Sequence, residues 1–366
     1  MKFLIQREDL LIPLQKIIGA VEKKQTMPAL SNVLVKADEE SLVLTATDLE
    51  IELVTNLQMI IDEPGETTLP ARKLLDICKA LPDESTINIS VKSDKASIHS
   101  GRSRFSLATL PASDFPVLDS INSVAGFDIP QKILKELIDN TAFAMAQQDV
   151  RYYLNGLLLE VSTDRLRTVA TDGHRLACCE KEMHCDLTET KQVILPRKGV
   201  HELVRLLSDS DETVHLTLGT NHLRAEIGEY RFTSKLIDGR FPDYNRVIPE
   251  DGNNVMSADR EILRQALVRA SILSNEKYRG IRMILEENLL RLQTQNPDQE
   301  EADVEVEVNY SGESLEIGFN VNYMLDVLNV NSLDIVQTTL RDSNSSCLLT
   351  FPEQKNCKYV IMPMRL

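Results

Sequence analysis

The sequence lacks most of the features that mark membrane, secreted or metal-binding proteins. It has no tryptophan in 366 residues, and only 5% of its residues are aromatic. The longest apolar runs, such as Leu157–Leu159, fall far short of the roughly 20 residues that a membrane-spanning helix needs. Charges at Lys2, Arg7 and Glu8 arrive too early for the apolar stretch of a signal peptide. We therefore expect a cytoplasmic protein that does not enter the membrane.

Cysteine is scarce and follows no pattern. The six cysteines form no CxxC pair and no even spacing, so neither a disulfide framework nor a zinc site is predicted. We expect all of them to be free thiols that are buried by packing. The loose string His184–Cys185–Asp186 favours a solvated loop over a metal site. The cysteines are Cys78, Cys178, Cys179, Cys185, Cys347 and Cys357.

Catalytic signatures are also missing. The sequence has no Walker loop, no glycine-rich dinucleotide fingerprint, no nucleophile elbow, no HExxH pair and no EF-hand loop. We expect no catalytic centre, no metal and no cofactor. The net charge of −16 argues against nucleic acid if it is spread evenly, because an acidic surface repels phosphates. With 42% hydrophobic residues, the chain has enough apolar side chains for two to three globular domains.

The chain contains an internal repeat of about 120 residues. Ala46–Thr–Asp48 reappears as Ala170–Thr–Asp172, and Leu69–Pro–Ala–Arg–Lys reappears as Leu195–Pro–Arg–Lys. Phe105–Ser–Leu, followed by Asp114–Phe–Pro, reappears as Phe232–Thr–Ser, followed by Arg240–Phe–Pro. A more diverged third copy is marked by Gly318–Leu328. Matches in the same order at nearly the same offset predict three tandem domains.

Each repeat combines helical and alternating patterns. Apolar doublets at spacings of three to four predict two helices per repeat, and segments such as Ile87–Val91 and Val214–Leu218 alternate as half-buried antiparallel strands do. The pattern predicts an α+β fold with the helices on one face of antiparallel sheets. The predicted helices are 10–18, 71–80, 131–144, 197–207, 259–272 and 321–330. Linkers near Asn122–Ala125 and Pro249–Asn254 give domain boundaries of 1–121, 126–248 and 254–366.

Charge is distributed unevenly between these elements. The six predicted helices hold 12 basic and 7 acidic residues, a net charge of +5, which leaves −21 for the rest of the chain. One interpretation is that helices simply favour lysine and arginine. The other is that the helices share a face that meets a polyanion, while the acidic exterior rejects random binding. Because no base-reading motif is present, any DNA contact should be independent of sequence.

One segment of the second repeat resembles a catalytic group. Asp172, His174 and Arg175 are residue types that serve in acid–base chemistry. The first repeat has Asp48 at the equivalent position with neither His nor Arg beside it, so Thr–Asp is interpreted as a structural turn. Gly173–His174–Arg175 occurs only in the second repeat and is therefore a candidate for binding.

Two further segments set single repeats apart. Asp149–Gly156 carries Arg151 before two tyrosines, which suit either core packing with one exposed ring or a nucleic-acid path. Tyr359–Leu366 is unusually apolar for a chain end. It suits either the last strand of the third domain or a groove lined by adaptable methionines.

These strings resemble the bacterial DNA sliding clamp family, the beta subunits of DNA polymerase III, over the whole chain. The most specific strings are Gly101–Leu107, Asp149–Gly156, Thr168–Ala177, Pro196–Val200, Asp238–Tyr244, Ile272–Lys277 and Met362–Leu366. The resemblance implies a processivity factor without catalysis. It would be a head-to-tail dimer whose six clamp domains form a ring, with helices lining the hole and double-stranded DNA inside it.

The resemblance also implies how the ring closes. The first domain of one chain would meet the third domain of the other by strand pairing, with a small apolar core and a charged rim. The residues at matching positions are Lys73, Arg102, Arg104, Phe105 and Leu107 on one side, and Ile272, Leu273, Asp298, Glu300 and Glu301 on the other.

A partner pocket between the second and third domains is implied as well. It would take short peptides with Leu and Phe anchors from the polymerase III catalytic subunit, the clamp loader, other polymerases and repair proteins. One half is Arg151, Leu154, Thr171, Gly173, His174, Arg175, Leu176, Pro242 and Val247. The other half is Asn320, Tyr323, Val360, Met362, Pro363, Met364 and Arg365, with Asn344 standing where the family often has an aliphatic residue.

DNA contacts carried over from the family lie on loops and helices. They are Lys24, Arg72, Gln148, Tyr152, Tyr153, Arg197, Lys198, Arg205 and Arg246. The first loop reads Lys23–Lys–Gln–Thr26, where the family has an arginine followed by proline. Two rival hypotheses remain: an enzyme built around Asp172, His174 and Arg175, and an acidic scaffold that binds proteins only.

Overall fold

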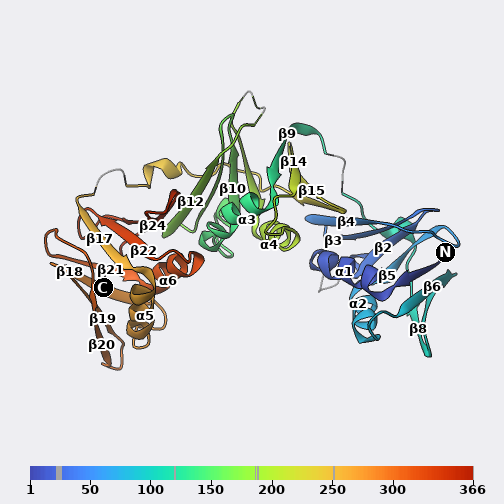
Figure 1. Cartoon of the computed structure of the whole chain (residues 1–366), viewed down its shortest axis with the longest axis horizontal. Helices are drawn as coiled ribbons and strands as arrows, with labels where there is room; N and C mark the ends of the chain where they lie inside the picture. The colour runs from blue at the N-terminus through green and yellow to red at the C-terminus, as the bar shows by residue number, and fades with distance from the viewer. Residues whose placement is uncertain (22–26, 119–120, 186, 188, 250–251, 366) are drawn as a thin grey trace. The chain divides into compact units, whose positions relative to one another are not determined.

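The computed structural model describes residues 1–21, 27–118, 121–185, 187, 189–249 and 252–365. Its elements divide into two compact units, residues 1–135 with 198–236, and residues 136–197 with 237–366. Each unit contains one four-stranded and one eight-stranded antiparallel sheet (Figure 1). The units therefore do not follow the repeats, because each eight-stranded sheet continues from one repeat into the next. The predicted domain boundaries stay a prediction.

The first unit is built on strands from repeats one and two. Its four-stranded sheet has the order β1-β6-β7-β8, and its eight-stranded sheet has the order β5-β2-β3-β4-β16-β15-β14-β9. The repeats join where β4 pairs with β16, and Leu53 lies opposite Phe232 there. The bounds are β1 Lys2–Gln6, β2 Asn32–Ala37, β3 Ser41–Thr47, β4 Ile51–Gln58, β5 Gly65–Pro70, β6 Thr86–Lys92, β7 Lys95–Ser100, β8 Ser103–Ala108, β9 Ser123–Pro130, β14 Thr213–Gly219, β15 His222–Ile227 and β16 Tyr230–Lys235.

The second unit repeats this plan with repeats two and three. Its sheets have the orders β13-β10-β11-β12-β24-β23-β22-β17 and β20-β19-β18-β21. The repeats join where β12 pairs with β24, and Ala177 lies opposite Tyr359 there. The bounds are β10 Gly156–Val161, β11 Arg165–Thr171, β12 Arg175–Glu182, β13 Lys191–Pro196, β17 Asn254–Asp259, β18 Gly280–Glu286, β19 Leu289–Gln295, β20 Glu301–Glu307, β21 Leu315–Asn320, β22 Ile335–Leu340, β23 Cys347–Phe351 and β24 Gln354–Ile361.

Two α-helices per repeat confirm the α+β prediction. They are α1 Arg7–Ile17, α2 Ala71–Ala80, α3 Gln131–Asp139, α4 Arg197–Leu206, α5 Arg260–Ser271 and α6 Val321–Val330. The predicted end of the third helix at 144 is wrong. The Thr141 hydroxyl donates to the carbonyl of Leu137, and residues 142–144 form a separate 3-10 turn. The helix therefore ends at Asp139.

The helices carry the charge imbalance that the sequence predicted. With the observed bounds they hold 13 basic and 8 acidic residues, again a net charge of +5. Their apolar sides are buried, for example Leu74 and Cys78 on α2 and Leu263 and Leu267 on α5. Several basic side chains are exposed on the opposite sides, for example Arg72, Lys73 and Lys79 on α2.

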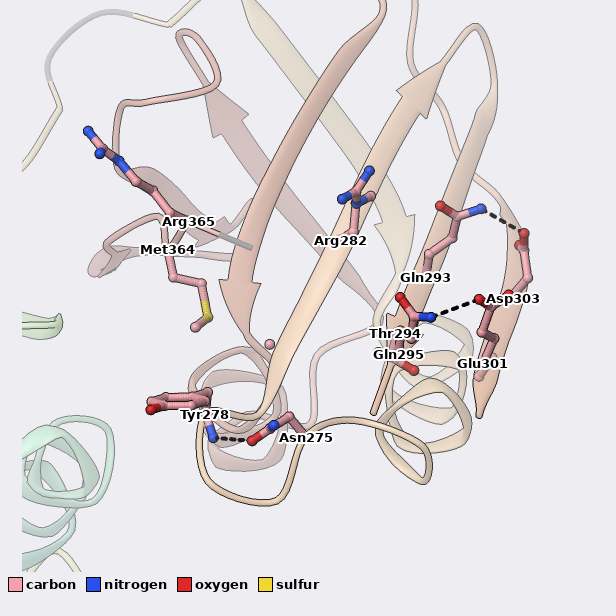
Figure 2. A pocket seen from close by; sticks show the side chains of 12 residues that line it. Asn275, Tyr278, Arg282, Gln293, Thr294, Gln295, Glu301, Asp303, Met364 and Arg365 are labelled. Atoms are coloured by element: carbon pink, nitrogen blue, oxygen red, sulfur yellow. Dashed lines mark hydrogen bonds between the residues drawn. The ribbon is translucent and has the colours of Figure 1, made fainter. Parts of the chain in front are cut away.

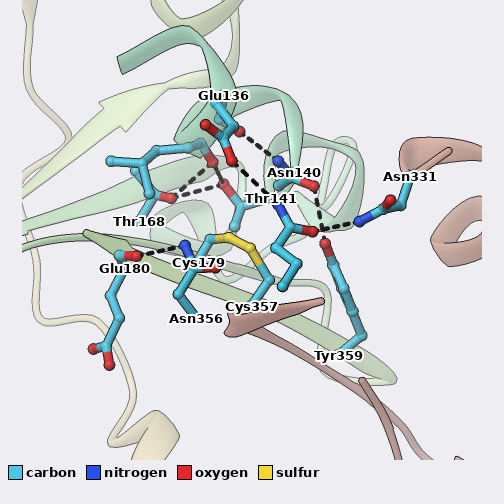
Figure 3. Close-up of a disulfide and its surroundings, with 12 residues drawn as sticks. Glu136, Asn140, Thr141, Thr168, Cys179, Glu180, Asn331, Asn356, Cys357 and Tyr359 are labelled. Carbon is cyan, nitrogen blue, oxygen red and sulfur yellow. Dashed lines mark hydrogen bonds between the residues drawn. A yellow bond between two sulfur atoms is a disulfide. The ribbon is translucent and has the colours of Figure 1, made fainter. Parts of the chain in front are cut away.

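One prediction about cysteine is wrong. Cys179 on β12 and Cys357 on β24 lie directly opposite each other and form a disulfide, with their Cα atoms 4.1 Å apart (Figure 3). Both are fully buried. No sequence pattern indicates this bond, because the two residues are 178 positions apart and become neighbours only when repeats two and three share a sheet. Cys78, Cys178 and Cys347 are buried free thiols, as predicted.

Within the described ranges, no helix is both long enough and apolar enough to cross a membrane. Among the same residues, no group of three or more His, Cys, Asp or Glu side chains is arranged to hold a metal ion. Asp186 of the string His184–Cys185–Asp186 lies outside the described residues.

The disulfide gives a first prediction. Protein denatured without reductant and then alkylated should carry four labels on its six cysteines, and reduction should expose two more. Cys357→Ala should lower the free energy of unfolding by about 2–5 kcal/mol, as loss of a native disulfide does. Cys178→Ala is the matched control, because it removes a buried thiol from the neighbouring strand β12 but breaks no bond. Six labels without reductant would contradict the bond.

Candidate binding pocket

The turn between β11 and β12 confirms that Thr–Asp is a structural element. The Thr171 hydroxyl donates to the carbonyl of Arg175, and Asp172 Oδ1 accepts the backbone N–H groups of His174 and Arg175 at 2.9 and 3.0 Å. The turn of the first repeat has the same bonds from Thr47 and Asp48. Both turns place their third residue at positive φ, 88° at Gly173 and 75° at Leu49.

The side chains of this turn serve structural contacts. Arg175 Nε donates to Asp172 Oδ2 at 3.1 Å, and its other nitrogens bind Asp326 of α6 and the carbonyl of Phe143. The Arg175 guanidinium also lies 4.6 Å from the ring centroid of Tyr323. Both oxygens of Asp172 are therefore occupied, which argues against the hypothesis of an enzyme built on Asp172, His174 and Arg175.

Next to this turn lies a small apolar pocket of about 170 Å³. Its floor is the face of the eight-stranded sheet on which Leu176 of β12 and Val360 of β24 lie opposite each other. A wall comes from the segment after β16, which contributes Pro242, Tyr244 and Val247. The lining residues are Arg151, Tyr153, Leu154, Thr171, Gly173, Arg175, Leu176, Pro242, Tyr244, Val247, Val360 and Met362. The structure thus brings together ten of the sixteen predicted pocket residues.

Arg151 forms the charged rim of the pocket. Its guanidinium donates to Asp149 at 2.9–3.1 Å and to the carbonyl of Asp172 at 3.3 Å. The hydrogen bonds from Arg151 lower the pKa of Asp149 to about 2, so this carboxylate stays ionised at neutral pH. A side chain on Gly173 would come within 3.0 Å of the Arg151 guanidinium, which is a second reason for glycine at that position.

The remaining predicted pocket residues lie beside the pocket or away from it. The rings of His174 and Tyr323 stack with centroids 6.4 Å apart, and Asn320 caps α6 by accepting the N–H of Asn322 at 2.9 Å. The His174 carbonyl accepts the N–H of Met362 at 2.8 Å, which places the chain end against the turn. Pro363 follows Met362 and is half-buried.

Met364 and Arg365 line a different groove, on the outer face of β18, β19 and β20 (Figure 2). This groove measures about 650 Å³ and also contains Tyr278, Arg282 and Asp303. In the second repeat, the N–H of Ile237 donates to the carbonyl of Ile194. The residues that follow Ile237 cover the equivalent face of the sheet that contains β10, β11 and β12. In the third repeat the N–H of Met364 donates to the carbonyl of Gly318 at 2.8 Å, and Met364 and Arg365 border the groove.

The predicted DNA contacts differ in how free their side chains are. Arg72 on α2 is exposed and forms no ion pair within the part of the chain that the structure describes. Lys198 pairs with Asp48, and Arg205 binds Glu202 at 2.7 Å and the carbonyl of Gln15 at 3.0 Å. These α4 side chains help to join repeats one and two.

The other predicted DNA contacts lie mostly on loops. Tyr152 is 60% exposed, Gln148 is exposed at φ 56°, and Arg246 is exposed beside Asp243. Arg197 is half-buried and donates to the carbonyl of Met145, and burial together with the nearby Arg175 charge lowers its pKa. Lys24 lies outside the described residues.

Four of the predicted interface residues lie on two strands that have a free edge among the described strands, and the others lie on nearby helices and turns. β8, with Arg104, Phe105 and Leu107, pairs only with β7, and β20, with Glu301, pairs only with β19 among the described strands. Arg102 immediately precedes β8, and Lys73 is exposed on α2. Ile272, which follows α5 and precedes Leu273, is 72% exposed. Asp298 and Glu300 lie in the turn that leads into β20.

Sequence reasoning missed Tyr244, whereas Tyr153 fits the interpretation of core packing beside one exposed ring. Tyr244 is 3% exposed and lines the pocket, and the half-buried ring of Tyr153 packs on the same cluster. The string Asp238–Tyr244 was among the most specific of the resemblance, but it gave Tyr244 no role. Burial raises the pKa of Tyr244 to about 12, so its hydroxyl remains protonated.

Comparison with protein families matches nearly the whole chain in three parts. The N-terminal domain of the DNA polymerase III beta subunit matches residues 1–119, the central domain matches residues 128–243, and the C-terminal domain matches residues 245–365. Three matches in tandem agree with the three repeats in the sequence.

Full-length relatives and solved structures are equally similar. The beta sliding clamps of Pseudomonas aeruginosa and Escherichia coli K12 are 54% and 48% identical, with all of both chains covered. The crystal structure of the DNA polymerase III subunit beta from Pseudomonas aeruginosa covers both chains fully with a TM-score of 0.97. A Caulobacter crescentus beta sliding clamp, 39% identical, covers 100% of this chain and 99% of that one with a TM-score of 0.95. The chain therefore belongs to the DNA polymerase III beta subunit family, the beta sliding clamps.

Proposed function

We propose that two copies of this chain close head to tail into a ring that encircles double-stranded DNA and slides along it. The ring would tether the polymerase III catalytic subunit, the clamp loader, other polymerases and repair proteins through the apolar pocket. It would work in the cytoplasm and catalyse no reaction. One observation carries the proposal: the chain joins its own repeats twice by the same strand pairing and leaves one strand of each kind with a free edge among the described strands.

Each junction pairs the last strand of one repeat with the fourth strand of the preceding sheet. β16 pairs with β4, and β24 pairs with β12, both antiparallel. The strand equivalent to β16 and β24 in the first repeat is β8, and the strand equivalent to β4 and β12 in the third repeat is β20. Both have one free edge among the described strands. A second copy completes both edges, and two such junctions close a ring.

The register of the new junction follows from the two that exist. Phe232 lies opposite Leu53, and Tyr359 lies opposite Ala177. Phe105 is the equivalent of Phe232 and Tyr359, since each follows a basic residue on its strand. The equivalent residues on β4, β12 and β20 are Leu53, Ala177 and Ala302. Each lies opposite a residue that stands two positions before the turn between the third and fourth strands of its repeat. These opposite residues are Ala46, Ala170 and Thr294. Phe105 should therefore lie opposite Ala302 of the partner subunit.

Charge complementarity supports this register. In this register Arg104, one residue before Phe105, lies opposite Asp303 of the partner subunit. Arg102, three residues before Phe105, lies opposite the partner's Glu305. Opposite charges directly across a strand pair stabilise it, whereas like charges would not. Exposed Ile272 beside Leu273 would supply the apolar part of the contact, while Leu107 is already buried within its own chain.

The helices support the DNA part of the proposal. Their net charge of +5 in a chain of −16 concentrates positive charge on one kind of element. Contacts to phosphates from Arg72, Arg197 and neighbouring side chains would hold the duplex without reading bases, which sliding requires. Arg197, Lys198 and Arg205 already have partners in the chain, so we expect them to contribute less than Arg72.

The cytoplasm and the disulfide are compatible on physical grounds. Thiols there are kept reduced by small reductants, and disulfides are uncommon. Cys179 and Cys357 are fully buried between β12 and β24, so a reductant reaches them only when the sheet opens.

The register gives a cross-linking prediction. Ser103 and Val304 of the partner subunit occupy the position at which Cys357 and Cys179 bond inside the chain. The double variant Ser103→Cys, Val304→Cys should therefore form two inter-chain disulfides and run as a covalent dimer on a non-reducing gel. Ser103→Cys with Asp303→Cys is the matched control, because a shift of one residue places the thiols on opposite faces. A cross-link in the control alone would disprove the register.

The ring predicts topological binding to DNA. Clamps loaded on a nicked circular plasmid should stay bound in high salt, and cutting the circle should release them from the ends. The cross-linked ring of the preceding variant, closed before loading, should not load at all. Two outcomes would overturn encirclement. One is that the clamp stays bound after the circle is cut, and the other is that salt releases it equally from circular and linear DNA.

The pocket predicts peptide binding that depends on its apolar floor. Met362 is 37% exposed and lines the pocket, so Met362→Ala should leave folding intact and weaken a labelled peptide with Leu and Phe anchors about tenfold, the effect of losing one well-buried side chain. Met59→Ala, a half-buried methionine of the other unit, is the control. Fluorescence anisotropy measures both, and equal affinities for the two variants would exclude this pocket as the site.

A further inference from the structure

A row of polar side chains crosses the sheet at one end of the pocket floor. Gln192, Glu160, Arg167 and Glu180 lie opposite one another on β13, β10, β11 and β12. Arg167 donates to Glu160 Oε1 at 3.1 Å and to Glu180 Oε2 at 2.5 and 2.8 Å. Gln192 donates to the second oxygen of Glu160 at 2.5 Å. The row is therefore bonded from strand to strand by its own side chains.

Tyr244 connects this row to the pocket wall. Arg167 Nη1 donates to the Tyr244 hydroxyl at 2.6 Å, and the hydroxyl donates to Glu160 Oε1 at 3.0 Å. The Arg167 guanidinium also lies 5.6 Å from the centroid of the Tyr244 ring. Arg167 and Glu160 have side-chain exposures of 14% and 12%, so water competes weakly for these bonds.

The wall has few other anchors. Phe241 and Tyr244 are its buried side chains, while Pro242 and Asp243 are exposed. Before the wall, the backbone N–H of Ile237 donates to the carbonyl of Ile194 on the sheet. Within the wall, the N–H of Val247 donates to the carbonyl of Tyr244. The position of Pro242 and Val247, which line the pocket, depends on where Tyr244 is held and on the packing of Val247 and Ile248 against the same apolar cluster.

We propose that Arg167 and Glu160 act through the Tyr244 hydroxyl as positioning residues for peptide binding, keeping the wall formed by Pro242 and Val247 in its binding arrangement. This inference rests on the proposed peptide-binding function of the pocket. Because the wall is fixed before a peptide arrives, less conformational entropy is lost on binding. Arg167 and Glu160 do not line the pocket, and their effect passes entirely through Tyr244.

The test compares tyrosine and phenylalanine at position 244. Tyr244→Phe keeps the ring but removes both hydroxyl bonds, and Arg167 and Glu160 stay paired with each other. Affinity for a fluorescein-labelled synthetic peptide with Leu and Phe anchors should fall about three- to tenfold, chiefly through faster dissociation. Backbone amides of residues 241–247 should exchange hydrogen faster, while the melting temperature changes little. Arg167→Lys, which keeps one donor, should lie between wild type and Tyr244→Phe.

Tyr310→Phe is the matched control. Tyr310 is 1% exposed in the same unit, and its hydroxyl bonds to Asn254 at 3.2 Å and to the carbonyl of Glu313 at 2.6 Å. It lies outside the pocket, so this variant should bind peptide as wild type does. Wild-type affinity in Tyr244→Phe, or equal losses in the two variants, would overturn the positioning role. If wild type itself binds no peptide, the proposed function of the pocket fails instead.

Discussion

Antiparallel pairing between strands of successive repeats is the interaction on which the rest of the structure depends. A single repeat has a sheet edge that would otherwise expose unpaired N–H and C=O groups. Pairing of β4 with β16 and of β12 with β24 satisfies these edges and turns two four-stranded sheets into one of eight strands. The disulfide, the pocket and the unpaired edges at β8 and β20 all follow from this one way of joining repeats.

The two internal junctions show how similar backbones acquire different roles. At the second junction Leu176 lies opposite Thr171 and forms the apolar floor of the pocket. At the first junction Glu52 takes that position opposite Thr47, is only 4% exposed, and accepts the backbone N–H of Leu118 at 3.3 Å. A buried carboxylate under a bonded loop gives no room or affinity for an apolar anchor. One side chain therefore helps to explain why the pocket forms at the second junction.

The basic side chains of the helices also fall into two groups. Some basic residues of the helices stabilise the chain itself, as Lys198 does with Asp48 and Arg205 with Gln15, while others such as Arg72 project without an ion pair among the described residues. A count over the sequence gives the sum but does not separate these groups. The separation matters because a side chain that is already bonded within the fold must break that bond before it can bind a phosphate.

The sequence by itself determined the three repeats, the α+β class, the basic helices and the structural nature of the Thr–Asp turn, because these depend on local periodicity and on comparison between copies. It also named ten of the residues that line the pocket, through the resemblance. Only the tertiary structure decided that Cys179 meets Cys357, that Arg167 reaches Tyr244, and that Met364 lies in a separate groove. These contacts join residues from different strands or repeats, and the register of paired strands, which sets them, leaves no mark in any one segment.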